Sequence, residues 1–157
     1  MARTFECKTA IAAPPEAVFA ALVNADAYGQ WMPNFVRIER TGSGPLQVGE
    51  SFRETRRMFG ADSTEHFDVV EVEAPVRLVL RVDGSKGTTG KGLFTFEHLI
   101  EAQGTGSQLT LRGTVDVPGL VARLLGGVFI GMFKSAIAKD MSAMGNWIAS
   151  RQSAGGG

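Results

Sequence analysis

The chain has 157 residues, the size of a single domain that can bury about 70% of its unfolded surface. Hydrophobic residues make up 44% of the sequence and charged residues 20%, which is typical of a soluble globular protein, and the formal net charge is zero. Because the basic residues are scattered along the chain, we expect no nucleic-acid partner. The single cysteine, Cys7, excludes an internal disulfide and is typical of a reducing compartment.

The apolar stretches of the chain predict a cytoplasmic location. The first ten residues, MARTFECKTA, lack the apolar core that a signal peptide needs. The most apolar window, Gly119 to Phe133, is shorter than a membrane span and contains Arg123. We therefore expect no integral membrane segment.

The first third of the chain predicts one strand and then two short helices. Residues 4–11 alternate well enough between apolar and polar for a strand. Pro15 suits the first position of a helix, and Glu16 suits its positive end. The predicted buried stripe of this helix consists of Val18, Phe19, Leu22 and Val23. Asp26 can cap a second short helix that ends near Trp31.

Six further strands are predicted between residues 35 and 117, separated by turn residues. They cover residues 35–40, 50–59, 64–73, 76–83, 92–101 and 108–117. The short loops between them indicate successive antiparallel hairpins, which makes about seven strands in all. Because apolar residues concentrate on one face of each strand, the sheet is expected to bury one face and expose the other.

Residues 118–151 predict one long helix that is interrupted near its start. Its second half has a continuous apolar face in which Asp140 is the one charged residue. The apolar residues of the first turns, Leu120, Val121, Leu124, Leu125 and Val128, point in another direction. The pair Gly126-Gly127 lies between the two faces, where a kink is easiest.

This order of elements predicts an α+β fold in which a curved antiparallel sheet wraps around the C-terminal helix. A single domain would cover residues 1–151, and residues 152–157 would form a disordered tail. A curved sheet over one helix tends to leave a space between them, and we expect the function there.

Several segments in this order resemble the START-like (SRPBCC) superfamily. They are APPEAVFAALVNADAYGQWMP, VGESF, VVEVEAPVRLVLRV and FTFEHLIEAQGTGSQLTLRG, followed by the long amphipathic helix. The chain looks most like the polyketide cyclase/dehydrase and lipid-transport branch, whose fold is called helix-grip, over residues 4–150. The resemblance implies a hydrophobic cavity between sheet and helix. Because the superfamily contains carriers, sensors, cyclases, aromatases and lyases, the resemblance leaves the activity open.

Polar residues that interrupt apolar faces are the candidates for chemistry in such a cavity. His98 alternates in phase with apolar neighbours on its strand, and Asp140 projects from the helix. The other polar residues that share phase with apolar ones are Glu54, Arg56, His66 and Asp68. Two imidazoles with carboxylates around an apolar space could transfer protons at an enolisable carbonyl. The candidate catalytic residues are therefore His98, His66 and Asp140.

Each candidate also has a purely structural interpretation. The two histidines can be packing or rim residues that are held by hydrogen bonds. Asp140 can pair with a neighbouring arginine where the helix leaves the sheet, and Glu54 and Arg56 can form a cross-strand ion pair on the wet face.

The predicted ligand-binding residues combine these polar groups with aromatic and methionine side chains of the two facing surfaces. They are Trp31, Phe52, Arg56, His66, Phe94, Phe96, His98, Phe129, Met132 and Phe133. Two histidines without close partner spacing give no zinc motif, and residues 84–92 (GSKGTTGKG) lack the spacing of a phosphate loop, so we expect no metal and no cofactor.

Three functions agree with the sequence. The first is a protein that binds a hydrophobic small molecule, such as a lipid, a polyketide or an aromatic metabolite. The second is an enzyme of the cyclase/dehydrase kind that uses His98 or His66 with a carboxylate, and the third is an interaction module with a vestigial cavity. The apolar start of the long helix predicts either a lid over the cavity mouth or a homodimer contact centred on Leu124.

Overall fold

The computed structural model describes residues 2–155, apart from the side chains of residues 121–125, 129 and 155. Over these residues the chain forms an antiparallel sheet of seven strands, a long C-terminal helix and short helices after the first strand. The predicted helix-grip architecture is therefore confirmed.

The strands follow one another along the sheet in a nearly continuous meander. The elements are β1 (Arg3–Ile11), α1 (Pro15–Val23), η1 (Ala25–Gln30), β2 (Phe35–Arg40), β3 (Ser51–Met58), β4 (Ala61–Glu73), β5 (Arg77–Asp83), η2 (Gly84–Lys86), β6 (Leu93–Gln103), β7 (Gly106–Asp116) and α2 (Leu120–Gly155). Their order in the sheet is β1-β7-β6-β5-β4-β3-β2, and every neighbouring pair is antiparallel. The strands from β2 to β7 pair in the order in which they follow one another in the chain, so short hairpins are sufficient to build most of the sheet.

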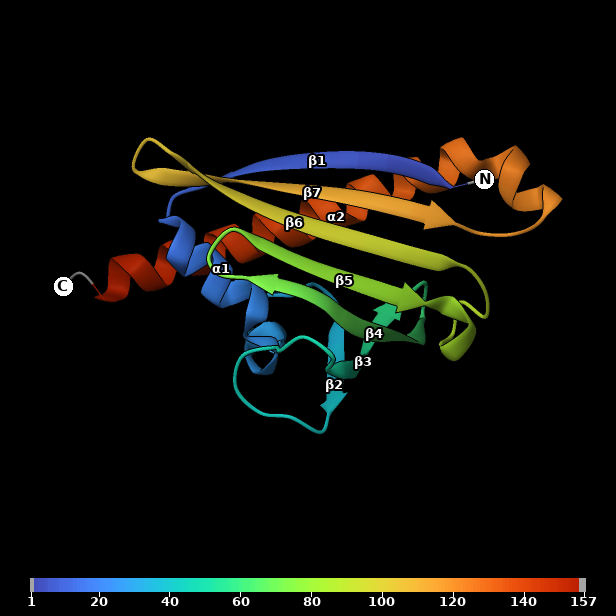
Figure 1. The fold of residues 1–157 in the computed structure, drawn as a ribbon, viewed down its shortest axis with the longest axis horizontal. Helices are drawn as coiled ribbons and strands as arrows, with labels where there is room; N and C mark the ends of the chain where they lie inside the picture. Colours follow the sequence, from blue (N-terminus) through green and yellow to red (C-terminus); the bar gives the residue numbers. More distant parts are fainter. Residues whose placement is uncertain (1, 156–157) are drawn as a thin grey trace.

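The sheet curls around α2, and α1 and η1 lie at one end of the arrangement (Figure 1). The backbone of α2 approaches β1 and α1 closely. At this end the main apolar core forms, where Val18 of α1 and Met144 of α2 are fully buried together with Leu78 of β5. The C-terminal half of α2 is therefore held by the core, whereas the middle strands of the sheet lie farther from the helix backbone.

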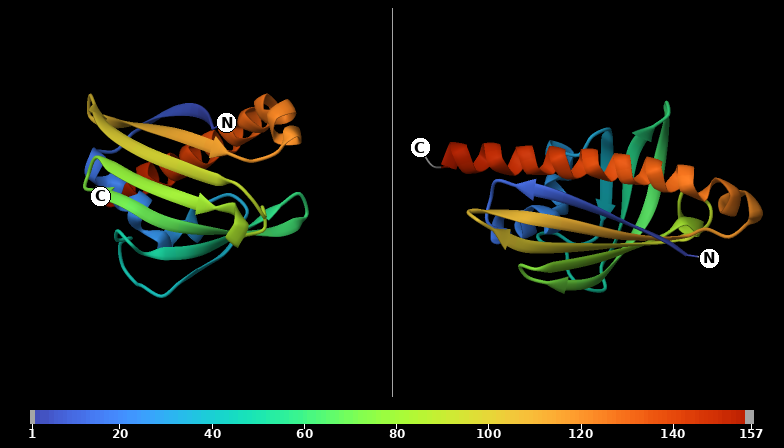
Figure 2. Two further views of the ribbon diagram at one scale, coloured as in Figure 1. Left: turned by 45° about the vertical axis from the view of Figure 1, so that its right-hand side comes forward. Right: turned by 90° about the horizontal axis from the view of Figure 1, so that it is seen from above.

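The N-terminal part of α2 is much more exposed than its C-terminal half. Leu120 is 68% exposed, Val128 65% and Met132 48%. The first turns of α2, orange in Figure 2, turn away from the axis that the rest of the helix follows. The predicted lid or dimer contact falls largely on side chains outside the described set, those of Val121, Leu124 and Leu125. Both versions of that hypothesis therefore stay predictions.

The helix α2 passes close to the side chain of Arg3 at Gly126. A Cβ atom added at Gly126 would clash with the guanidinium group of Arg3. The side chain of Arg3 therefore lies against the helix at one of the two glycines that were expected to mark the kink.

The C-terminal helix is longer than the sequence analysis suggested. Residues 152–155, assigned above to a disordered tail, continue α2 as far as Gly155. This part of the predicted tail is wrong, because Gln152, Ser153 and Ala154 contain neither a proline nor another signal that would end a helix. Within the part of the chain that is described, no helix combines the length and apolar character needed to cross a membrane.

The register of β4 changes in the middle of the strand. Its pairing with β5 shifts between Val69 and Glu71, which marks a β-bulge. An extra residue at a bulge reverses which alternate side chains face the helix. Val69 before the bulge and Val72 after it accordingly both pack against the core. In a regular strand, residues three positions apart would point to opposite faces.

Candidate functional site

A cavity of about 1200 Å³ lies between the concave face of the sheet and α2. Its size is somewhat above the range of about 300–1000 Å³ that ligand-binding pockets usually have. The cavity arises because α2 packs closely on β1 and α1 only, so that the side chains of the middle strands do not fill the distance to the helix.

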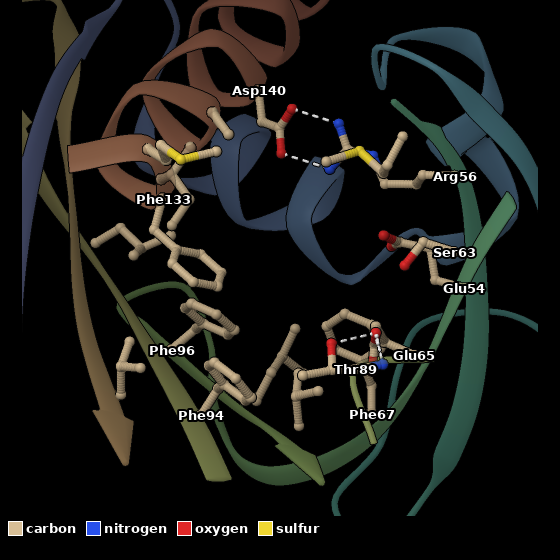
Figure 3. Close-up of a pocket in the computed structure, with 18 of the residues that line it drawn as sticks. Glu54, Arg56, Ser63, Glu65, Phe67, Thr89, Phe94, Phe96, Phe133 and Asp140 are labelled. Atoms are coloured by element: carbon tan, nitrogen blue, oxygen red, sulfur yellow. Dashed lines mark hydrogen bonds and ion pairs between the residues drawn. The ribbon is translucent and has the colours of Figure 1, made fainter. Parts of the chain in front are cut away.

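Aromatic side chains form one wall of the cavity. Phe94 and Phe96 point inward from β6, and Phe133 reaches down from α2 (Figure 3). The ring centroids of Phe94 and Phe133 are 5.6 Å apart. A second pair, Phe52 of β3 and Phe67 of β4, stacks at 4.9 Å on the other side of the cavity, among the polar residues. The remaining apolar lining includes Leu22, Met32, Leu78, Leu80, Val82, Leu111, Val115, Ile130, Met132, Ile137 and Met141.

Polar side chains from β3 and β4 form the opposite wall. Alternation along β3 directs Phe52, Glu54 and Arg56 inward, and Ser63 and Glu65 of β4 line the cavity beside them. Glu54 and Glu65 are cross-strand partners, and so are Arg56 and Ser63. Figure 3 shows Glu54, Arg56 and Ser63 on the side of the cavity that faces the phenylalanines. A ligand in this space would therefore contact aromatic rings on one side and charged groups on the other.

Arg56 forms a two-pronged ion pair with Asp140 of α2. Its Nη1 lies 2.8 Å from Asp140 Oδ2, and its Nη2 lies 2.7 Å from Oδ1. Nε and Nη2 also donate to the carbonyl oxygen of Pro33, at 3.2 and 2.8 Å. Bidentate pairs of this kind are the stronger charge-assisted hydrogen bonds. The pair joins β3, the segment before β2 and the long helix, so the structural interpretation of Asp140 as the partner of an arginine is the one that the geometry supports.

Glu54 is a buried carboxyl group without a hydrogen bond to any residue that the structure describes. Its side chain is 8% exposed and lines the cavity. Burial raises the pKa of Glu54 to about 7; the positive charge of Arg56 opposes this rise, and the negative charge of Asp140 adds to it. Near neutral pH the group therefore exists in both protonation states.

His98 also lines the cavity, but it is buried and uncharged at neutral pH. Its Nδ1 lies 3.2 Å from the carbonyl oxygen of Leu78, its partner across the β5–β6 ladder. Burial lowers the pKa of His98 to about 4, although hydrogen bonds with the backbone of Leu78 and Phe96 oppose the shift. The carbonyl contact places the proton of the neutral ring on Nδ1, which leaves Nε2 as a hydrogen-bond acceptor.

Two aromatic residues from the η1 region line the cavity, and their polar atoms are buried or engaged within the protein. The Tyr28 hydroxyl donates a hydrogen bond to the carbonyl oxygen of Leu22. The indole nitrogen of Trp31 is buried and has no hydrogen-bond partner among the described residues. The two rings contact edge to face, with centroids 5.4 Å apart.

The far end of the polar wall is tied to the loop after η2. Oε1 of Glu65 accepts hydrogen bonds from the backbone nitrogen and the hydroxyl of Thr89, at 2.9 and 2.6 Å. Its Oε2 is buried without a partner among the residues described. Tyr28, Ser63, Glu65, Thr89 and Lys91 all line the cavity and were not predicted from the sequence. For Ser63 and Glu65 the available signal was their alternation with Phe67.

The prediction that His66 and Asp68 face inward is wrong. Neither lines the cavity; His66 Nε2 lies 3.1 Å from Asp68, and Asp68 accepts a hydrogen bond from Ser51 on the outer side of the sheet. Val72 packs against the core, but it lies beyond the bulge between Val69 and Glu71, so its orientation does not extend by simple alternation to His66 and Asp68. His66 therefore cannot share a cavity with His98.

The other predicted ligand-binding residues lie at the cavity, with one outside the described set. The lining includes Trp31, Phe52, Arg56, Phe94, Phe96, His98, Met132 and Phe133. The side chain of Phe129 lies outside the described set. Among the residues described, no group of three or more histidine, cysteine, aspartate or glutamate side chains is placed to hold a metal ion. Contact of these residues with a ligand stays a prediction.

A known protein family matches nearly the whole chain. The family model described as polyketide cyclase/dehydrase and lipid transport matches residues 2–146. The chain belongs to this family. No curated protein sequence matches it.

Solved structures share the fold of this family member at low sequence identity. The crystal structure of Ara h 8.0201 superposes with a TM-score of 0.77 at 20% identity, and the alignment covers 96% of this chain and 99% of the other. The protein TTHA0849 from Thermus thermophilus gives 0.73 at 12% identity, with 95% and 99% covered. The di-domain ARO/CYC StfQ of the steffimycin biosynthetic pathway gives 0.78 at 12% identity, covering 98% of this chain and 53% of StfQ. These similarities establish the fold and not the ligand.

The opposite pKa shifts of Glu54 and His98 predict two opposite pH dependences of stability. Between pH 4.5 and about 7 the folded protein keeps a proton on Glu54 that the unfolded chain releases, so this contribution to the free energy of unfolding falls as pH rises. Between about pH 4 and 6.5 the folded protein keeps His98 neutral, so its contribution falls as pH decreases. Each effect is on the order of 3 kcal/mol over its window, and the two largely cancel in the wild type.

Substitutions should separate the two contributions. Relative to wild type, Glu54→Gln should gain stability from pH 4.5 to 7, and His98→Gln should gain it from pH 6.5 down to 4, each by roughly 2 to 3 kcal/mol. Urea unfolding at a series of pH values measures both differences, with Glu101→Gln on the exposed face of β6 as a control for the loss of a carboxyl group that is not buried. A flat difference curve for Glu54→Gln would mean that its carboxyl is not the buried acid described here.

The ion pair between Arg56 and Asp140 should contribute much more to stability than an exposed pair. Asp140→Ala leaves a half-buried guanidinium without its partner and should lower the free energy of unfolding by about 2 kcal/mol or more. Asp62→Ala removes an exposed partner of Arg57 and should cost less than about 1 kcal/mol. Equal losses for the two variants in urea unfolding would contradict a bridging role for Arg56.

Proposed function

We propose that this protein binds hydrophobic small molecules, those with aromatic ring systems above all, in the cavity between the sheet and α2. The observation that carries the proposal is the cavity of about 1200 Å³ with its wall of phenylalanines, Phe94, Phe96 and Phe133. Aromatic rings bind other rings favourably in offset or edge-to-face contacts. An open cavity of this size favours a ligand-binding protein over an interaction module with a vestigial cavity.

The family and the solved structures support the same class of ligand. The family description names both polyketide cyclisation and lipid transport, and StfQ is described as part of a biosynthetic pathway. Lipids, polyketides and aromatic metabolites are therefore all included in the proposal. The density of rings on one wall favours aromatic molecules among them.

An enzyme of the cyclase/dehydrase kind is the second candidate. The observation that favours it is a buried acid, Glu54, with a pKa of about 7 that faces the same cavity as the neutral imidazole of His98. A group that titrates near neutral pH can both accept and donate a proton at an enolisable substrate. Asp140 is less suited to this role, because its carboxylate is occupied by Arg56.

Binding of a neutral polycyclic probe tests the first candidate. We expect 2-methoxyanthracene to bind the purified protein saturably with one site per chain, measured by its fluorescence. Replacing both Phe96 and Phe133 by alanine should weaken binding by roughly tenfold or more, because two ring contacts of about 0.5–1.5 kcal/mol each are lost.

The matched control removes an apolar side chain elsewhere on the surface. Val48→Ala changes a residue that is 61% exposed and does not line the cavity, so it should leave the affinity unchanged. A long-chain fluorescent alcohol tested in parallel distinguishes an aromatic from an aliphatic preference. The proposal fails if neither probe shows saturable binding.

A further inference from the structure

The hydrogen-bonding capacity of Arg56 is almost fully used inside the protein. Nε and Nη2 donate to Pro33, and Nη1 and Nη2 donate to Asp140. Four of the five N–H groups of the guanidinium are thereby committed. The positive charge of Arg56 is also neutralised by Asp140. Arg56 therefore has no pair of free N–H donors and no excess positive charge with which to bind an anionic ligand.

Glu54 lies two residues earlier on the same face of β3, and its hydrogen-bonding capacity is unused. Its carboxyl is buried against the cavity and forms no hydrogen bond with any described residue. The donors close to it are engaged elsewhere: Arg56 as above, and the Tyr28 hydroxyl by the carbonyl oxygen of Leu22. A buried polar group without a partner destabilises the fold, so its presence requires an explanation.

Two further unpartnered polar atoms belong to residues of the lining, on Trp31 and Glu65. The indole N–H of Trp31 is buried and donates to no described residue. Neither the indole nitrogen nor Oε2 of Glu65, the other unpartnered buried atom of the lining residues, is accessible from the cavity, so Glu54 is the group that the wall presents to a ligand. A carboxyl group in this position matches a ligand oxygen that can both donate and accept, such as that of a hydroxyl.

We propose, on the basis of the ligand-binding function above, that Glu54 is a specificity-determining residue that binds a hydroxyl group of a neutral aromatic ligand. A hydroxyl donates to Glu54 when the carboxyl is ionised and accepts from it when the carboxyl is protonated. A carboxylate in the place of this hydroxyl is disfavoured, because it meets Glu54 and Asp140 while Arg56 is already neutralised, and Lys91, the lysine of the lining, belongs to the loop after η2 and not to β3.

A matched series of anthracenes tests this specificity. The wild type should bind 2-hydroxyanthracene roughly tenfold more tightly than 2-methoxyanthracene, the ratio that one hydrogen bond gives. Anthracene-2-carboxylate should bind at least tenfold more weakly than the methyl ether. A probe with a methylammonium group in place of the hydroxyl reports on the alternative that Glu54 selects cations.

Two substitutions at Glu54 connect the selectivity to this residue. In Glu54→Leu the preference for the hydroxyl over the methyl ether should fall to about one, and in Glu54→Gln the affinity for the carboxylate should rise at least tenfold. Glu101→Gln, on the outer surface, should change neither ratio. Binding of 2-methoxyanthracene confirms in each variant that the cavity is intact.

The outcomes separate the inference from the function on which it rests. If the methyl ether binds but the hydroxyl preference is missing in the wild type, or survives in Glu54→Leu, the role of Glu54 is wrong and the binding function stands. Tighter binding of the ammonium probe than of the hydroxyl probe also overturns the inference. If no member of the series binds saturably, the binding function itself fails.

Discussion

The ion pair between Arg56 and Asp140 is the interaction on which the shape of the cavity depends. One helix cannot cover seven strands, and the backbone of α2 packs closely against β1 and α1 at one side of the arrangement. Arg56 comes from β3, near the opposite edge of the sheet, and reaches Asp140 across 84 positions of sequence. Burying two charges is costly, but bidentate geometry and the Pro33 carbonyl offset much of that cost. The helix is thus held over the cavity without filling it.

The same arrangement explains the division of the cavity into two walls. Strands β5 to β7 turn aliphatic and aromatic residues inward, and they continue the core that α1 and α2 complete. On β3, by contrast, the inward positions after Phe52 are Glu54 and Arg56. Arg56 is balanced by the protein itself, whereas Glu54 is not. A carboxyl kept in this state weakens the fold at neutral pH, which is the usual pattern for a group that serves a ligand and not the stability of the chain.

The sequence was sufficient for the fold because its signals are local and agree with one another. Alternating strands, short hairpin loops and the start of α1 at Pro15 all predict the elements that the structure contains. The candidate site was only partly predictable. His98, Glu54 and Arg56 were placed inward by simple alternation, and the structure places them there.

The errors have specific physical causes. Alternation fails across a bulge, which is why His66 was placed inward and Ser63 and Glu65 were missed. An arginine partner for Asp140 was foreseen as an alternative, but its identity depends on how far the sheet curls toward the helix, which no local pattern reports. The contribution of η1, through Tyr28 and Trp31, depends on the same long-range packing.

A crystal structure of the complex with 2-hydroxyanthracene tests the central claim most directly. The account predicts that the rings lie between the aromatic wall and the polar wall, in contact with Phe96 and Phe133. It further predicts that the ligand oxygen lies about 2.5–3.0 Å from a carboxyl oxygen of Glu54. A ligand bound outside the cavity, or one whose oxygen points to the solvent while Glu54 has no contact with it, would contradict the account.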